Sequence, residues 1–190
     1  MTRFKSEEVE GEAVRTIAAM MASSARTAPK ARGIDAIETM IVDGDDIQAL
    51  ACAMEDKAKE QPPHLCSSFD RDARNVRSSS CVLLIGVVGD PKVIEKPLDC
   101  GACGYKGCEQ LLKARKRQGK DFSGPVCIFQ AIDLGIALGS AVKLAGGLNV
   151  DNRIMYTVGA AAKKLHLLDS DIIIGIPLSV TGKNPYFDRK

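Results

Sequence analysis

Near its middle the chain reads Val82-Leu83-Leu84-Ile85-Gly86-Val87-Val88, an unbroken apolar run. Its length and its β-branched residues predict a strand. Because no polar residue alternates with the apolar ones, both faces of that strand are expected to be covered. A second buried strand is predicted from Ile172 to Ile176, and a third strand from Ile37 to Val42.

Helical patterns fill much of the remaining chain. A helix capped by Ser6 is expected to run to about Ser24, because apolar residues recur at helical spacing: Val9, Ala13, Ile17 and Met20. The other predicted segments are a helix after Asp45, a polar loop over 60–80 with a short helix at 70–77, and helices over 128–147 and 152–164. Strands that alternate with helices predict one domain over residues 1–190, with an α+β or three-layer α/β fold.

Composition points to a cytoplasmic protein. The N-terminus lacks the apolar stretch of a secretory signal, and the net charge of +2 with no basic stripe does not predict nucleic-acid binding. The apolar stretch from Ile128 to Gly147 contains Gln130, Asp133 and Lys143, which are costly in a bilayer, so a buried helix is expected rather than a membrane span. Gly135 and Gly139 offer that helix a face for close packing.

Seven cysteines in such a compartment are not expected to form disulfides, and their clustering suggests another role. Asp99 to Cys108 reads DCGACGYKGC, which places Cys100, Cys103 and Cys108 in a C-x2-C-x4-C pattern. Three thiols this close converge on one point, and the glycines between them permit unusual backbone angles and close approach of amides. Thiolates select zinc, copper(I) or iron–sulfur centres.

Cys127 is the predicted fourth ligand. It follows Pro125 at the start of the apolar helix, where free N–H groups favour a thiolate and an anionic cluster. Structural zinc is the main alternative, although the second C-x2-4-C pair of usual zinc sites is missing. Unliganded buried thiols and a dithiol redox pair are further alternatives, and Cys52 and Cys81 are expected to be core residues.

The cysteine segment resembles the four-cysteine domain of corrinoid iron–sulfur proteins and of one subunit of the Rnf electron-transport complex. That resemblance implies a [4Fe–4S] cluster on Cys100, Cys103, Cys108 and Cys127, in a lobe inserted over residues 92–127. The loop before the fourth cysteine is slightly longer here than in that domain.

The whole chain is similar to the uncharacterised ferredoxin-domain-containing proteins. The segments that carry this likeness are Ala28 to Gly33, Asp133 to Ala137, Asn149 to Arg153 and Gly182 to Pro185.

A further resemblance, to the nitroreductase flavoproteins, rests on the Ala28-Pro29 turn after the first helix and on the late strand ending at Gly175-Ile176-Pro177. It implies a nitroreductase-like core and a homodimer with FMN at the subunit interface. If FMN binds, its phosphate partners are Arg26, Lys30 and Arg32, since guanidinium and ammonium groups suit phosphate. The Arg-Ser-x-Arg phosphate signature of that family is absent. The alternative for these three basic residues is a solvent-exposed turn that binds no ligand.

Three functions follow as hypotheses. The first is a cytoplasmic [4Fe–4S] electron-transfer protein that serves a redox partner protein or a flavin on the same chain; the others are a zinc-stapled binding module and an FMN-dependent reductase. If the chain is an enzyme, it is expected to be an oxidoreductase. The basic run Lys113 to Arg117 is a candidate docking site for an acidic partner, or the solvated face of a helix.

Overall fold

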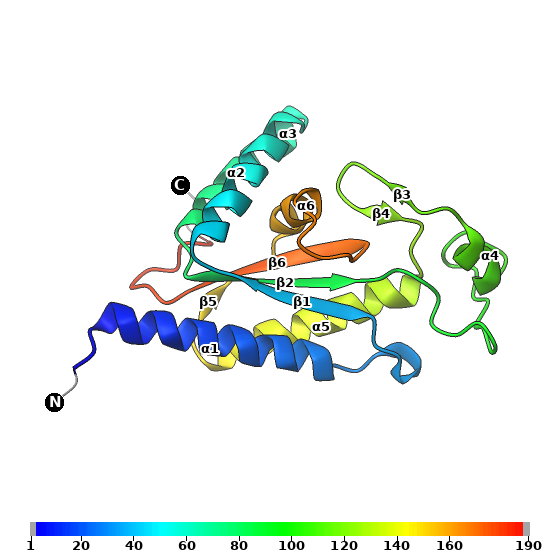
Figure 1. Ribbon diagram of the computed structural model, residues 1–190, viewed down its shortest axis with the longest axis horizontal. Coiled ribbons are helices and arrows are strands. Elements are labelled where there is room, and N and C mark those ends of the chain that lie inside the picture. The colour runs from blue at the N-terminus through cyan, green and yellow to red at the C-terminus, as the bar shows by residue number, and fades with distance from the viewer. Residues whose placement is uncertain (1–2, 188–190) are drawn as a thin grey trace.

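A four-stranded antiparallel sheet forms the middle of the structure, a computed structural model that describes residues 3–187 (Figure 1). The strand order is β1-β2-β6-β5, where the strands span Ile37–Val42, Cys81–Val87, Ile172–Ser179 and Asp151–Asn152 in that order. In the register, Leu84 of β2 lies opposite Met40 of β1 and Gly175 of β6. All seven residues of β2 are buried, as the apolar run predicted.

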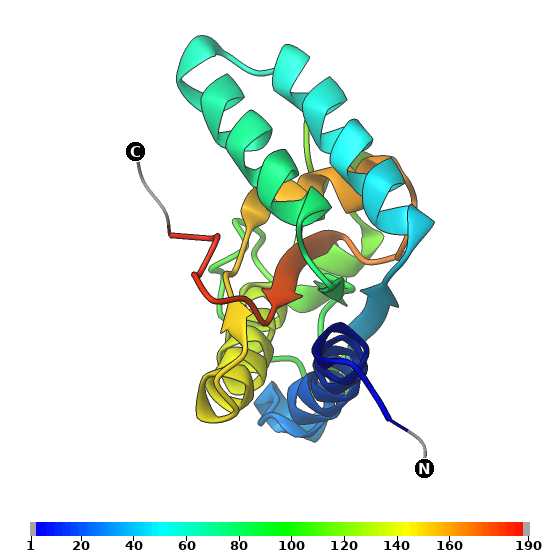
Figure 2. The same cartoon turned by 90° about the vertical axis from the view of Figure 1, so that its left-hand side faces the viewer.

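Two helices cover one face of the sheet: α1 (Ser6–Thr27) and α5 (Ile128–Gly147). Figure 2 shows them side by side below the strands, and their backbones approach closely enough for the Ser24 and Ser140 hydroxyls to lie 2.8 Å apart. Apolar side chains fill the space against β2 and β6, among them Val14, Ala18, Met21, Leu134, Ala137 and Ala141.

The opposite face carries α2 (Asp45–Lys59), α3 (Pro63–Arg77) and α6 (Tyr156–Lys164). A Cβ on Gly159 of α6 would lie 1.7 Å from the Ile173 carbonyl oxygen of β6, so only glycine permits this approach of helix to strand. The result is a three-layer α+β fold, in which antiparallel pairing excludes the parallel-sheet alternative.

Several expectations for the helices were wrong. The N-cap of α1 is Lys5 rather than Ser6, and the helix expected over 152–164 begins only at Tyr156, since Asp151–Asn152 form β5 against β6. Most of the predicted apolar stripe of α1 faces outward, with Val9 53% and Met20 46% exposed, and only its Ile17 packs against the core. The buried stripe is Val14, Ala18, Met21 and Ala25. Alanines occupy part of the buried face because α1 lies close to α5 and to the sheet. Residues 60–80 are mostly helical rather than looped, since Pro63 suits a first turn and Phe69, Ala73 and Val76 bury one face.

Within residues 3–187, α5 alone is long and apolar enough to cross a membrane. Its inner face packs against the sheet, and its polar residues Gln130 and Asp133 are buried inside the protein, which is the arrangement of a core helix. Gly135 and Gly139 lie on the exposed face, and nothing stands within 4 Å of a Cβ built on either, so they do not serve the close packing that was expected.

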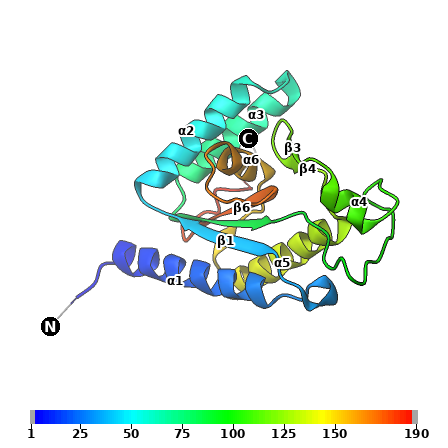
Figure 3. The same ribbon diagram turned by 45° about the vertical axis from the view of Figure 1, so that its right-hand side comes forward.

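The cysteine-rich segment leaves the sheet after β2 and returns at α5 (Figure 3). It contains α4 (Cys108–Lys113) and a short hairpin of β3 (Arg117–Gln118) and β4 (Ser123–Gly124). A single 3-10 turn, η1 (Ala31–Gly33), lies between α1 and β1. These pieces surround the candidate site.

Candidate metal centre

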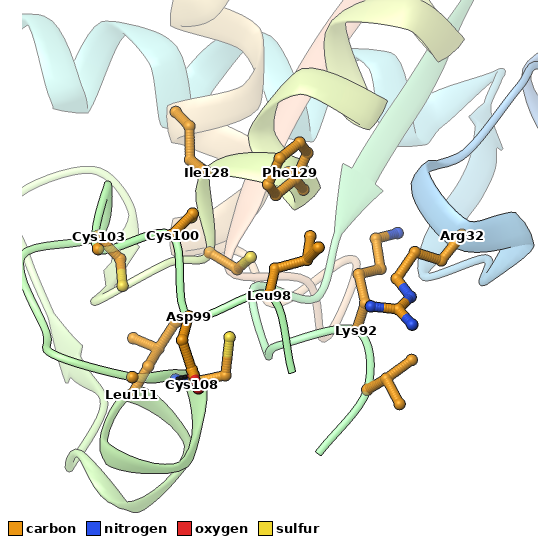
Figure 4. A pocket seen from close by; sticks show the side chains of 14 residues that line it. Arg32, Lys92, Leu98, Asp99, Cys100, Cys103, Cys108, Leu111, Ile128 and Phe129 are labelled. Carbon is orange, nitrogen blue, oxygen red and sulfur yellow. Dashed lines mark hydrogen bonds between the residues drawn. The ribbon is translucent and has the colours of Figure 1, made fainter. Parts of the chain in front are cut away.

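One cavity collects the four predicted cysteine ligands. Cys100, Cys103, Cys108 and Cys127 all line it, together with Arg32, Lys92, Leu98, Leu111 and Phe129 (Figure 4). Cys100 and Cys103 come from the loop before α4, Cys108 is the first residue of α4, and Cys127 stands at the start of α5. The fold therefore brings together thiols that are far apart in the sequence, which is what a shared centre requires.

Asp99 holds the cysteine loop in its closed shape. Its carboxylate accepts a hydrogen bond from the Cys108 N–H at 2.7 Å, and its own backbone has a φ of 45°. Gly101 and Gly104 have φ of 72° and 86°, a region that glycine enters without strain, and the Gly104 N–H closes a turn on the Gly101 carbonyl at 2.9 Å. Sequence reasoning gave Asp99 no role, since a single carboxylate beside a cysteine motif carries no spacing signal.

Cys127 is buried and is the N-cap residue of α5. Its N–H donates to the Gly89 carbonyl at 2.8 Å, and its carbonyl accepts from the Gln130 N–H at 3.1 Å. The first turn of a helix presents free N–H groups and partial positive charge, which suit an anionic centre bound beside it. The backbone at Cys127 is thus tied to the chain just after β2.

The donor set suits a thiolate-ligated centre. Among residues 3–187, no three His, Cys, Asp or Glu side chains stand close enough together to hold a single metal ion, but four cysteines line one cavity. Four thiolates are the ligand set of a [4Fe–4S] cluster, in which each thiolate bonds its own iron. They are also the ligand set of a structural zinc ion, which all four thiolates bind at once.

A buried ion pair adjoins the cavity. Lys92 lies 2.5 Å from Asp133 of α5, and the two side chains are 3% and 2% exposed. Lys92 also donates to the Ile34 carbonyl at 2.7 Å, and Asp133 accepts from the Ala31 N–H at 3.0 Å. The pair therefore joins three segments: the turn after α1, the chain leaving β2, and α5.

The three predicted phosphate partners lie in different surroundings. Arg26 donates to Asp35 at 2.5 Å and to the Ile37 carbonyl at 2.6 Å, while Lys30 donates to the Ala25 carbonyl at 2.8 Å. Burial raises the pKa of Asp35, but the hydrogen bond from Arg26 and further contacts outweigh it and hold that pKa below its ordinary value. Only Arg32 lines the cysteine cavity, where it donates to the Lys96 carbonyl at 2.8 Å.

The remaining cysteines lie away from the cavity. Cys81 is buried in β2, as expected, and burial raises its pKa to about 12. Cys52 is exposed on α2, so the expectation that it belongs to the core was wrong. Cys66 of α3 donates to Asp70 at 3.7 Å, and desolvation together with that carboxylate raises its pKa.

The hairpin of the cysteine segment is anchored to the core at its tip. Lys57 of α2 is 3% exposed and lies 2.6 Å from Asp121, which also accepts a hydrogen bond from the Tyr156 hydroxyl of α6. The Tyr156 ring packs edge-on against Phe69 and Phe122, with ring centroids 6.1 and 5.4 Å away. These partners lie far apart in the sequence, so no local pattern could have predicted their contact.

The base of the hairpin has its own anchor. Lys116 pairs with Asp171 beside β6 and, at 2.9 Å, with Asp90. Asp171 also accepts from the Gly89 N–H at 2.7 Å, next to the carbonyl that binds Cys127. Burial lowers the pKa of Lys116, but the hydrogen bonds to the two carboxylates outweigh it and raise that pKa overall.

Comparison with known proteins gives two kinds of likeness. Residues 123–189 match the model of a family described as uncharacterised proteins containing a ferredoxin domain. An uncharacterised protein of Archaeoglobus fulgidus is 48% identical over 186 residues, which cover 98% of this chain and 97% of that protein.

Among solved structures, a nitroreductase-like family protein from Bacillus cereus superposes with a TM-score of 0.55 at 10% identity, over 93% of this chain and 79% of that one. The NADPH:FMN oxidoreductase of Vibrio harveyi gives a TM-score of 0.53 at 11% identity, over 92% of this chain and 63% of that one. At such low identity the likeness shows the fold alone, and it confirms the nitroreductase-like core expected from the sequence.

Proposed function

We propose that this chain, which belongs to the family of uncharacterised proteins that contain a ferredoxin domain, is a one-electron carrier with a [4Fe–4S] cluster on Cys100, Cys103, Cys108 and Cys127. The observation that carries the proposal is the single cavity that all four cysteines line. The ferredoxin-domain family supports a redox role for the chain.

The protein's own groups suit such a centre. Four thiolates complete the coordination of four irons and leave no open site, which favours electron transfer over Lewis-acid catalysis. The bound cluster would supply the one-electron chemistry. Leu98, Leu111 and Phe129 form apolar walls, and Arg32 places positive charge beside an anionic centre, whereas Asp133 balances the charge of Lys92. Asp99 and the start of α5, which also line the cavity, hold the backbone of Cys108 and Cys127 in place.

A test of this role compares two cysteine variants under anaerobic conditions. Wild-type protein should show broad absorbance near ~400 nm that dithionite bleaches. Cys103→Ser should lose this chromophore, whereas Cys52→Ser should retain it, because Cys52 lies on α2 outside the cavity. Equal behaviour of the two variants would contradict the ligand assignment. A colourless wild-type protein with one zinc would support the zinc-stapled module instead.

An FMN-dependent reductase is the second candidate, favoured by the nitroreductase-like fold. In that case the cluster would pass electrons to or from a flavin on the same chain. Arg26 and Lys30 already bind Asp35 and the end of α1, so Arg32 is the phosphate partner with the fewest internal contacts. Yellow flavin released on denaturation would support this candidate, and failure to bind FMN on reconstitution would remove it.

A homodimer is also part of the proposal. The outward faces of α1 and α5 are apolar, with Val9, Met20, Ile132 and Ile136 each at least 40% exposed, and the two helices lie side by side (Figure 2). Such a surface is typical of a contact between subunits. Light scattering should give the mass of two chains, and Ile136→Asp should give the mass of one. A cytoplasmic location without nucleic acid or membrane remains a prediction of the sequence.

A further inference from the structure

A second hollow lies on the same segment as the cysteines. It is a cleft of about 610 Å³, lined by Tyr105, Lys113, Arg115, Arg117, Gly124 and Pro125 among others. Tyr105 stands between the second and third cysteines of the loop, and Gly124 and Pro125 lead into Cys127. The cleft and the candidate metal centre have no lining residue in common, but both are built from the cysteine loop, α4 and the chain that leads into α5.

The charges in this cleft follow from the backbone. Ala114 is extended after the end of α4, and β3 begins at Arg117, so successive side chains point to opposite sides. Arg115 and Arg117 accordingly line the cleft, whereas Lys116 turns inward to Asp90 and Asp171. Within the basic run, Lys116 therefore anchors the segment to the rest of the protein, and Arg115 and Arg117 form a pair that faces outward, here called the outward pair.

The outward pair is available to a ligand. The third cation in the cleft, Lys113, is already paired with Glu109 at 2.5 Å. Within residues 3–187, the guanidinium groups of Arg115 and Arg117 have no hydrogen-bond or ion-pair partner. Two free guanidinium groups beside one cleft match carboxylates, which they bind in bidentate fashion. The cleft is open, its arginines are exposed, and it suits a protruding acidic surface.

We propose that this cleft is the docking site for an acidic one-electron carrier protein, an inference that rests on the proposed function. A nicotinamide cofactor delivers a hydride, which an iron–sulfur cluster does not accept, so the chemistry calls for a carrier of single electrons. In the exchange, the reduced carrier loses one electron and the oxidised cluster gains it, with no bond made or broken. Docking at Tyr105 places the carrier beside the cysteine loop.

The test measures the rate at which a reduced, acidic bacterial ferredoxin reduces the cluster, by stopped flow at low salt. The charge reversal R115E/R117E should lower the second-order rate constant at least about tenfold, because electrostatic steering sets association rates. The control R3E/R74E makes the same change in net charge with two exposed residues outside the cleft, and it should leave the rate within about twofold. Added salt should slow the wild type and not R115E/R117E.

The outcomes separate this inference from the proposed function. Dithionite should reduce the cluster of R115E/R117E as fully as that of the wild type, which shows that the site is intact. Equal ferredoxin rates in the wild type and R115E/R117E, with the cluster present, would refute the docking alone. Calorimetric binding of inorganic pyrophosphate or NADPH that R115E/R117E abolishes, without binding of ferredoxin, would also refute it. A protein that holds no cluster would refute the proposed function and this inference with it.

Discussion

The buried pair of Lys92 and Asp133 provides a sharp test of how the site is joined to the core. Asp133→Asn keeps an oxygen that can accept from the Ala31 N–H and removes the charge that neutralises Lys92. Both side chains are at most 3% exposed, so the lysine is left as a buried, uncompensated charge. Loss of one partner of such a pair costs about 3–5 kcal/mol. For a chain of this size that corresponds to a fall in Tm of roughly 6–20 °C.

A double-mutant cycle gives the test its control. Lys92→Met should destabilise the chain by a similar amount, because it leaves a buried carboxylate, whereas Lys92→Met/Asp133→Asn removes both charges and should cost much less than the sum. Urea unfolding followed by circular dichroism measures the free energies. Single variants that lose less than about 1 kcal/mol, or a double variant that loses the full sum, would refute the idea that this pair joins the three segments.

Three further predictions address other parts of the site. Burial raises the pKa of Asp121, but its hydrogen bonds with Lys57 and Tyr156 outweigh burial and lower that pKa overall. The ionised Asp121 should therefore stabilise the fold above about pH 3.8, so Asp121→Asn should lower the free energy of unfolding there, and this loss should vanish as the pH falls further. Unfolding curves at several pH values measure it, and a difference that grows in acid would contradict the assignment. In folded protein at about pH 8, iodoacetamide should modify Cys52, which is exposed, and spare Cys81, whose pKa is raised to about 12 by burial; mass spectrometry that finds both labelled would show a looser core. Gly101→Ala should strain the cysteine loop by about 1–2 kcal/mol at its φ of 72° and lower the iron content, whereas Gly135→Ala on the open face of α5 should not; equal iron contents would show that the loop conformation is unimportant.

The sequence predicted the parts of the fold that local pattern controls. The apolar run of β2 and the C-x2-C-x4-C spacing are signals within a few residues, and both led to features that the structure shows: a buried central strand and a compact loop. The placement of Cys127 beside that loop also followed from chemistry, because a fourth thiol at a helix start suited the same centre.

The parts that were missed depend on tertiary contacts. Apolar spacing alone favoured a stripe of α1 that is mostly exposed, because two of the four residues buried on its inner face, Ala18 and Ala25, are alanines, which carry little hydrophobic signal. The pairs Lys92–Asp133 and Lys57–Asp121 join residues distant in the chain, so neither periodicity nor spacing could reveal them. The sequence of a basic run likewise does not tell which of its side chains form ion pairs within the protein. In this run Lys116 pairs with Asp171, which only the structure shows.

The most direct test of the central claim is the measurement of iron and acid-labile sulfide per chain in protein purified without oxygen. The four thiols that surround one cavity predict about four irons and about four sulfides, and none in Cys127→Ser. One zinc per chain with no sulfide, or an iron content that Cys127→Ser leaves unchanged, would contradict the account.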